Sequence, residues 1–123
     1  MSKITVLVVE PAKKPYIKEI DITLESLQHE VGGYIQAIYP FEEPVAIVAD
    51  DEAKLNGKLL NRALRDESGK IYDIIAGTFL IVGLTEDDFG SLSEECIQQF
   101  SEMFKSPEIF IDLGGGIIAL PNE

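Results

Sequence analysis

The chain has 123 residues and a formal net charge of −12 at pH 7, and 46% of its residues are hydrophobic. This length favours a single domain, and the composition is sufficient for a hydrophobic core without disulfides or a structural metal. The one cysteine, Cys96, excludes an intramolecular disulfide and a zinc site made of four thiolates. We therefore expect one acidic domain over residues 1–123.

The negative charge is unevenly distributed along the chain. Residues 1–70 contain twelve acidic and nine basic side chains, whereas residues 71–123 contain ten acidic side chains and one basic side chain, Lys105. An acidic surface repels nucleic acid and attracts basic partners. The apolar runs are too short to cross a bilayer, and a single cysteine fits a reducing compartment. We expect a cytoplasmic protein that binds neither nucleic acid nor membranes directly.

The first half of the chain predicts mainly strands. Residues 4–10 are apolar and β-branched up to Pro11, and residues 16–22 follow after a short turn, so the two segments predict a hairpin. Further strands are predicted over residues 34–39 and 45–49. The second of these is apolar throughout, which favours a central position in the sheet.

One short helix interrupts these strands. Thr23 is a good N-cap residue, since its hydroxyl can accept a hydrogen bond from a backbone N–H in the first turn. Leu24, Leu27 and Val31 then recur at helical spacing. The pair Gly32-Gly33 predicts the end of the helix, because glycine adopts the left-handed conformation at little cost.

The middle of the chain leaves two alternatives open. Residues 59–64 fit either a short strand or one helical turn. The apolar runs at 71–75 and 78–82 are joined at Ala76-Gly77, which fits a hairpin or one bulged strand. We regard Gly77, like Gly32 and Gly33, as a structural glycine.

A second helix is predicted after residue 90. Ser91 and Glu94 fit the pattern of a capping box, and Pro107 prevents continuation of the helix. Its apolar stripe consists of Cys96, Ile97, Phe100, Met103 and Phe104. Strands are expected at 108–113 and 117–120, with a glycine turn between them. The whole pattern predicts an α+β fold with a mostly antiparallel sheet of about six to seven strands and two helices.

Motifs for catalysis are weak. His29 is the one histidine and lies on the polar side of its predicted helix, and Cys96 occupies an apolar position, where a buried cysteine is expected. The acidic runs 50–52 and 86–88 supply oxygen donors for Mg²⁺, but they lack the ligand spacing of a known calcium loop. We expect no cofactor, no metal and no enzymatic activity, and a metal-dependent hydrolase is the last alternative.

Asn61 and Arg62 form a polar, cationic pair between apolar residues. One interpretation is structural, with Arg62 paired to Asp73 or to another acid inside the fold. The other interpretation is functional, with both side chains receiving a phosphate or a carboxylate, for example from a nucleotide-like ligand.

The acidic C-terminal region also has two interpretations. It is either a solvated face that keeps the protein soluble, or a surface that imitates DNA phosphates and occupies the basic groove of a DNA-binding protein. The residues of this candidate partner surface are Glu86, Asp87, Asp88, Glu94, Glu95, Glu102 and Asp112.

Three stretches carry a resemblance to a known family. They are Val31-Gly32-Gly33-Tyr34-Ile35, the segment 59–63 around Asn61-Arg62, and the segment 71–79 that contains Ala76-Gly77. Together with the opening strand they resemble the bacterial and phage family of domain of unknown function 3846. The resemblance covers residues 4–84 and more loosely the tail, and residues 85–107 match the shared pattern least well.

The resemblance implies a small protein carried by phages, plasmids or integrated mobile elements, often among antirestriction genes. It supplies no activity and no catalytic residues. From the charge and this resemblance we expect a non-enzymatic binding protein that inhibits a host defence or DNA-binding factor, with a basic host protein as its partner. A module for a small anionic ligand at Asn61 and Arg62 is the alternative. The oligomeric state does not follow from the residues.

Overall fold

An antiparallel sheet runs through the centre of the molecule. The computed structural model describes residues 3–122, and their largest sheet has the order β2-β1-β7-β4-β3, with β8 paired to β7. All neighbouring strands are antiparallel, which confirms the predicted sheet type. The strands are β1 (Lys3–Val9), β2 (Tyr16–Asp21), β3 (Ile35–Ile38), β4 (Val45–Asp50), β7 (Phe79–Leu84) and β8 (Phe89–Gly90).

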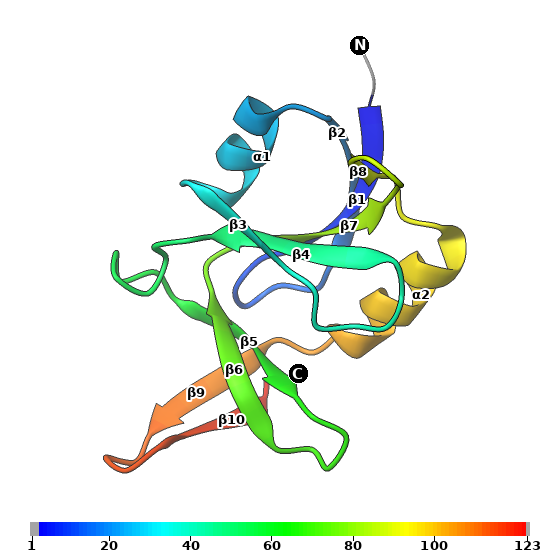
Figure 1. The fold of residues 1–123 in the computed structure, drawn as a ribbon. Coiled ribbons are helices and arrows are strands. Elements are labelled where there is room, and N and C mark those ends of the chain that lie inside the picture. Colours follow the sequence, from blue (N-terminus) through cyan, green and yellow to red (C-terminus); the bar gives the residue numbers. More distant parts are fainter. Residues whose placement is uncertain (1–2, 123) are drawn as a thin grey trace.

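Two separate hairpins lie at one end of this sheet (Figure 1). One consists of β5 (Leu60–Arg65) and β6 (Ile71–Ala76), and the other of β9 (Glu108–Asp112) and β10 (Ile117–Pro121). Residues 3–122 therefore contain ten strands and two helices, which is an α+β fold with more strands than the expected number.

The two helices cover opposite faces of the central sheet (Figure 1). Helix α1 (Leu24–Val31) buries Leu27 and Val31 against β-strand residues such as Val8. Helix α2 (Glu94–Met103) buries Phe100 on the other face, where Val9 and the β5–β6 hairpin also contribute. Successive residues of a strand point to opposite faces, so β1 contributes to both cores.

Strand β7 lies between β1 and β4 and is buried on both sides. Phe79 and Ile81 belong to the core beneath α2, whereas Leu80 and Val82 belong to the core beneath α1. All four side chains are inaccessible to solvent. Burial on both faces explains why this segment is a continuous apolar run instead of an alternating one. Each such side chain contributes roughly 1.5–3 kcal/mol to folding.

The start and end of α1 agree with the sequence prediction. The hydroxyl of Thr23 accepts a hydrogen bond from the backbone N–H of Ser26 at 3.1 Å. Gly32 follows the last turn with a φ of 76°, in the left-handed region, and its N–H donates to the carbonyl of Gln28. This arrangement satisfies carbonyls that the helix itself leaves without a donor.

The predicted start of α2 was wrong by two residues. Ser93 is the N-cap, and its hydroxyl accepts the hydrogen bond from the backbone N–H of Cys96 at 3.2 Å. Ser91 instead accepts a hydrogen bond from the backbone N–H of Thr5 at 2.9 Å and so attaches the helix entry to β1. The hydroxyl of Ser91, which the sequence pattern assigned to the helix cap, therefore makes a tertiary contact instead.

The region around Ala76-Gly77 also differs from the prediction. The two apolar runs form neither a hairpin nor one bulged strand, because β6 pairs with β5 and β7 pairs within the central sheet. Gly77, with a φ of 73°, turns the chain from the small hairpin into the large sheet. The ambiguous segment 59–64 is a strand, β5, whose register is irregular between Leu60 and Arg62.

Candidate functional site

Asn61 lies inside the fold and joins three segments. Its Nδ2 group donates to the backbone carbonyls of Val9 and Gly77, both at 2.8 Å. Its Oδ1 atom accepts a hydrogen bond from Nη1 of Arg62, also at 2.8 Å. The side chain is fully buried, so its polar atoms would destabilise the fold if they lacked these partners.

Arg62 is 1% exposed, and all of its donors are occupied. Nε and Nη2 donate to the carbonyl of Phe104, Nη2 also donates to the carbonyl of Lys13 at 2.6 Å, and Nη1 donates to Asn61. A guanidinium has five N–H donors, and each has an acceptor here. Burial lowers the pKa of Arg62, while the negative charge of Glu108 acts in the opposite direction.

This geometry supports a structural role for Asn61 and Arg62. Their hydrogen bonds connect β5 with the end of β1, the turn after it and the end of α2. No donor of Arg62 remains for an anionic ligand, because its acceptors are the backbone carbonyls of Phe104, Lys13 and Asn61 and the Oδ1 atom of Asn61. Asp73, the partner considered from the sequence, instead pairs with Lys54 at 3.2 Å.

Glu108 is a neighbour of this junction that the sequence did not indicate. Its Oε1 accepts a hydrogen bond from the backbone N–H of Ala63 at 3.1 Å, and its Oε2 pairs with Nη2 of Arg65 at 2.6 Å. The carboxylate therefore attaches β9 to β5. A glutamate at the start of a predicted strand does not indicate a contact with another strand, so the sequence could not predict this one.

An ion pair between a buried aspartate and a partly exposed lysine lies beside Gly33. Asp50, with its side chain 1% exposed, contacts Nζ of Lys58 at 2.5 Å through Oδ2, and its Oδ1 accepts a hydrogen bond from the N–H of Glu52. Burial raises the pKa of Asp50, but Lys58 and the N–H of Glu52 outweigh this effect, and the net pKa is lowered. Lys58 also donates to the carbonyl of Gly32. A Cβ on Gly33 would lie 2.6 Å from Oδ1 of Asp50, so this position requires glycine for space.

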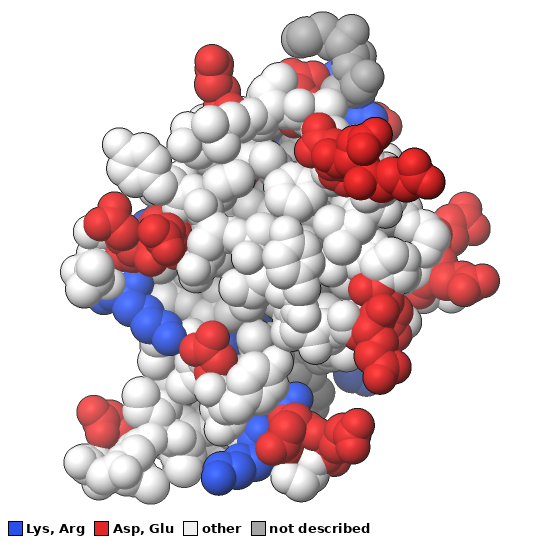
Figure 2. Space-filling model, viewed as in Figure 1, with Lys and Arg blue, Asp and Glu red and all other residues white. Residues whose placement is uncertain are grey.

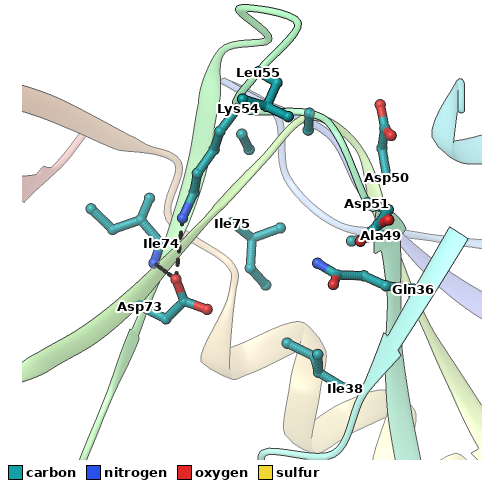
Figure 3. A pocket seen from close by; sticks show the side chains of 12 residues that line it. Gln36, Ile38, Ala49, Asp50, Asp51, Lys54, Leu55, Asp73, Ile74 and Ile75 are labelled. Carbon is teal, nitrogen blue, oxygen red and sulfur yellow. Dashed lines mark hydrogen bonds and ion pairs between the residues drawn. The ribbon is translucent and has the colours of Figure 1, made fainter. Parts of the chain in front are cut away.

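A small hollow of about 120 Å³ lies between β3, β4, the turn that follows β4, and β6. Figure 3 shows Gln36 and Ile38 on one side, Lys54 and Asp73 on the other, and Ile75 between them. The pair of Lys54 and Asp73 closes part of the rim. This volume accommodates a few water molecules, which is far below the volume of a typical ligand pocket.

The residues that line this hollow test the alternative of a metal-dependent hydrolase, which requires several carboxylates in one cleft. Asp50 and Asp51 line it together with Asp73, so part of the first acidic run does meet an acid from elsewhere. Two of these three carboxylates are paired with lysines. Within residues 3–122, no group of three or more His, Cys, Asp or Glu side chains has an arrangement that could hold a metal ion.

Acidic side chains lie on three segments near the end of the central sheet where β4 begins and β7 ends. We call this group the acidic rim. It lies on the β3–β4 loop, on the β7–β8 turn and at the start of α2. Its members are Glu42, Glu43, Glu86, Asp87, Asp88, Glu94 and Glu95.

Hydrogen bonds hold the three segments of the rim together. The N–H of Leu84 donates to the carbonyl of Pro44 at 2.9 Å, and Gln99 of α2 donates to Glu43 at 2.7 Å. The hydrogen bond from Gln99 lowers the pKa of Glu43. Figure 2 shows separate groups of acidic atoms along the right side of the view, where few basic atoms are visible, whereas at the left and bottom acidic groups lie next to the larger basic groups.

The rim differs in membership from the surface expected from the sequence. Glu102 pairs with Lys105 near the other end of α2, and Asp112 lies at the end of β9, where it accepts a hydrogen bond from the N–H of Gly114. Neither belongs to the rim. Glu42 and Glu43 do belong to it, and only the tertiary fold brings them to the acidic C-terminal segments.

The other candidate residues lie where the sequence placed them. His29 is exposed on α1, and Cys96 is buried in the core beneath α2. The glycines 114–116 form a hairpin turn between β9 and β10. No helix in residues 3–122 is long and apolar enough to span a membrane.

Comparison with known families identifies the chain. The family model described as Domain of unknown function (DUF3846) matches residues 4–105. The chain belongs to this family. The match includes residues 85–105 with α2, a region that we expected to fit the shared pattern least well, and it ends before the β9–β10 hairpin. The chain has no match among curated proteins or solved structures.

Proposed function

We propose that this DUF3846 protein is a non-enzymatic binding protein of a mobile element, and that its acidic rim occupies a basic surface of a host protein. The observation that carries this proposal is the composition of the rim. Seven carboxylates lie on three adjacent segments, and residues 40–44 and 84–95 contain no lysine or arginine. Such a surface attracts a basic partner at long range.

The basic partner that we propose is a host defence or DNA-binding factor. Carboxylates of the β7–β8 turn and of the start of α2 are exposed, so they can approach a partner without unfolding. A groove that binds DNA phosphates is lined with lysine and arginine, and exposed carboxylates are the complementary groups. Occupation of such a groove would displace DNA.

A charge-neutral variant tests the proposal. In E86Q/D87N/D88N the β7–β8 turn loses three negative charges, whereas the control E19Q/E25Q/E67Q loses three charges from exposed sites on β2, α1 and the β5–β6 turn. Immobilised wild type should capture a basic protein from native-host lysate at about 50 mM NaCl and release it at about 500 mM. The captured protein, identified by mass spectrometry, should lose bound DNA when the wild type is added.

The affinity of the captured protein decides the outcome. Since each exposed charge pair contributes about 0.2–1 kcal/mol, we expect affinity for the rim variant to fall about tenfold and affinity for the control to stay close to wild type. Equal affinities for the two variants would show that net charge alone is responsible. That result, or the absence of a salt-sensitive partner that releases DNA, would overturn the proposal.

A further inference from the structure

The β9–β10 hairpin has one entirely apolar face. Ile111 is paired with Ile118 and Ile109 with Leu120, and directly paired residues of an antiparallel ribbon point to the same side. Leu113 continues the alternation, and its N–H donates to the carbonyl of Gly116. We call these five side chains the apolar hairpin face.

This face points away from the body of the protein. The opposite side of the hairpin carries Glu108, Phe110 and Ala119, which are partly buried, and Glu108 contacts β5. Asp112, Ile117 and Pro121 also lie on that side, near the two ends of the ribbon, and are exposed. The apolar side chains are instead 39–65% exposed. An isolated two-stranded ribbon is marginally stable in water, so covering this face would stabilise the hairpin further.

We infer that the apolar hairpin face is a dimer interface, and that its occupant is the same face of a second copy of this chain. Two such ribbons would pack face to face about a two-fold axis, with Ile and Leu side chains from both copies between them. The inference is independent of the acidic rim and of its proposed partner.

The distribution of charge favours a second copy. Each copy carries a net charge of −12, so two copies can approach only where the local charge is small. Residues 108–121 contain only two charged side chains, Glu108 and Asp112, and Glu108 is already paired with Arg65. The hairpin also lies at the opposite end of the molecule from the β7–β8 turn (Figure 1), so these acidic turns of the two copies would be far apart.

The exposed area matches a weak dimer. Five Ile and Leu side chains at these exposures offer on the order of 400 Å² per copy, or about 800 Å² in a dimer. The strand edges and the neighbouring Leu59, which is 72% exposed, add to this area. Interfaces near 1,000 Å² are typical of reversible complexes, so we expect a dissociation constant on the order of tens of micromolar.

Sedimentation equilibrium of the full chain tests the inference between about 5 and about 500 μM. Wild type should change from monomer to dimer over this range. Higher NaCl should strengthen the dimer because it screens the repulsion between two negative copies, whereas it should weaken binding through the acidic rim. E86Q/D87N/D88N should dimerise at least as well as wild type.

Lysine substitutions locate the interface. I118K and I111K place a charge on the apolar hairpin face and should each raise the dissociation constant more than tenfold. The control L24K changes a leucine that is 58% exposed on α1 and should leave the constant unchanged. Circular dichroism should show native melting for all three variants. I118C should form a disulfide-linked dimer under mild oxidation, which wild type, with Cys96 buried, should not.

Two results would overturn the inference. One is a wild-type chain that stays monomeric at every concentration and salt level, which would leave the face to a different protein. The other is dimerisation of folded I118K and I111K with the wild-type constant, which would place the interface elsewhere.

Discussion

The guanidinium of Arg62 donates two hydrogen bonds to the carbonyl of Phe104, with N···O distances of 3.2 Å from Nε and 2.9 Å from Nη2. Phe104 is the C-cap residue of α2, so a side chain from β5 satisfies a carbonyl that the helix cannot satisfy itself. The same guanidinium holds the carbonyl of Lys13. One buried cation on β5 thus connects the end of α2 with the turn after β1.

Arg62→Met should therefore be strongly destabilising. It keeps most of the apolar stem but leaves the carbonyls of Phe104 and Lys13 and the Oδ1 atom of Asn61 without donors. We expect the free energy of unfolding to fall by about 3–5 kcal/mol. Urea denaturation measures this value. Arg65→Met, which removes a partly exposed partner of Glu108, should cost about 1 kcal/mol, and an equal loss in both variants would contradict the role of Arg62.

Gly33→Ala should destabilise the fold for a steric reason. The new Cβ would lie 2.6 Å from Oδ1 of Asp50, so the buried carboxylate and its ion pair with Lys58 must shift. We expect a loss of about 1–3 kcal/mol in thermal or urea denaturation. The matched control is Gly115→Ala, where a Cβ would meet nothing within 4 Å. If both substitutions have the same effect, the contact with Asp50 is unimportant.

Asp50 should make stability depend on pH in the acidic range. Its pKa is lower in the folded chain than its ordinary value of 3.8, so the unfolded chain binds the proton more readily. The stabilisation is fully present above that value and is lost as the pH falls through the folded pKa. The difference in unfolding free energy between wild type and Asp50→Asn should therefore shrink below about pH 4.

Urea denaturation at several pH values measures this difference. Asp51→Asn removes the same charge from an exposed neighbour and serves as the control. A difference between wild type and Asp50→Asn that stays constant down to pH values at which the protein unfolds would rule out a native carboxylate at Asp50.

Tyr16 should titrate at unusually high pH. Its hydroxyl donates to Oε2 of Glu10 at 2.6 Å, and this hydrogen bond, together with burial and nearby negative charge, raises the pKa of Tyr16 to about 12. Alkaline titration followed by tyrosinate absorbance should contain one transition near pH 12 that is absent from Tyr16→Phe. In Glu10→Gln that transition should move to lower pH.

The same shift has a consequence for stability. Because the unfolded tyrosine loses its proton first, the contribution of Tyr16 is complete below its ordinary pKa of 10.0 and declines as the pH rises toward 12. Wild type and Tyr16→Phe should therefore converge in stability at alkaline pH. A constant difference between them would argue against the hydrogen bond.

Local patterns predicted the secondary structure where local chemistry decides it. Thr23 and Gly32 bound α1 as expected, because a cap hydroxyl and a left-handed glycine act within one turn. Ser91 was assigned wrongly because its hydroxyl bonds to Thr5, which is distant in the sequence. The role of Gly77 could not be predicted either, because the neighbouring residues do not indicate that β6 and β7 belong to different sheets.

In the candidate site, too, the sequence predicted the local features and missed the contacts between distant segments. The sequence identified Asn61 and Arg62 as an unusual polar pair, but it could not reveal that their partners are backbone carbonyls from β1, the following turn and α2. It identified the acidic run 86–88 as part of a candidate partner surface. It could not join that turn to Glu42 and Glu43, because that neighbourhood depends on strand order in the sheet.

The position of β7 has a consequence for the folding of the chain. Strand β7, residues 79–84, lies between β1 and β4. The β1–β2 hairpin and the β3–β4 pair therefore form no hydrogen bonds with each other and are joined only through β7. Contacts between residues so far apart in sequence close slowly. A nascent chain that has emerged from the ribosome only as far as residue 78 would hold two disconnected sheet fragments with apolar edges open to the solvent. Emergence of the next six residues should join the two fragments and reduce their vulnerability to proteases and to aggregation, and α2 should then cover the second core.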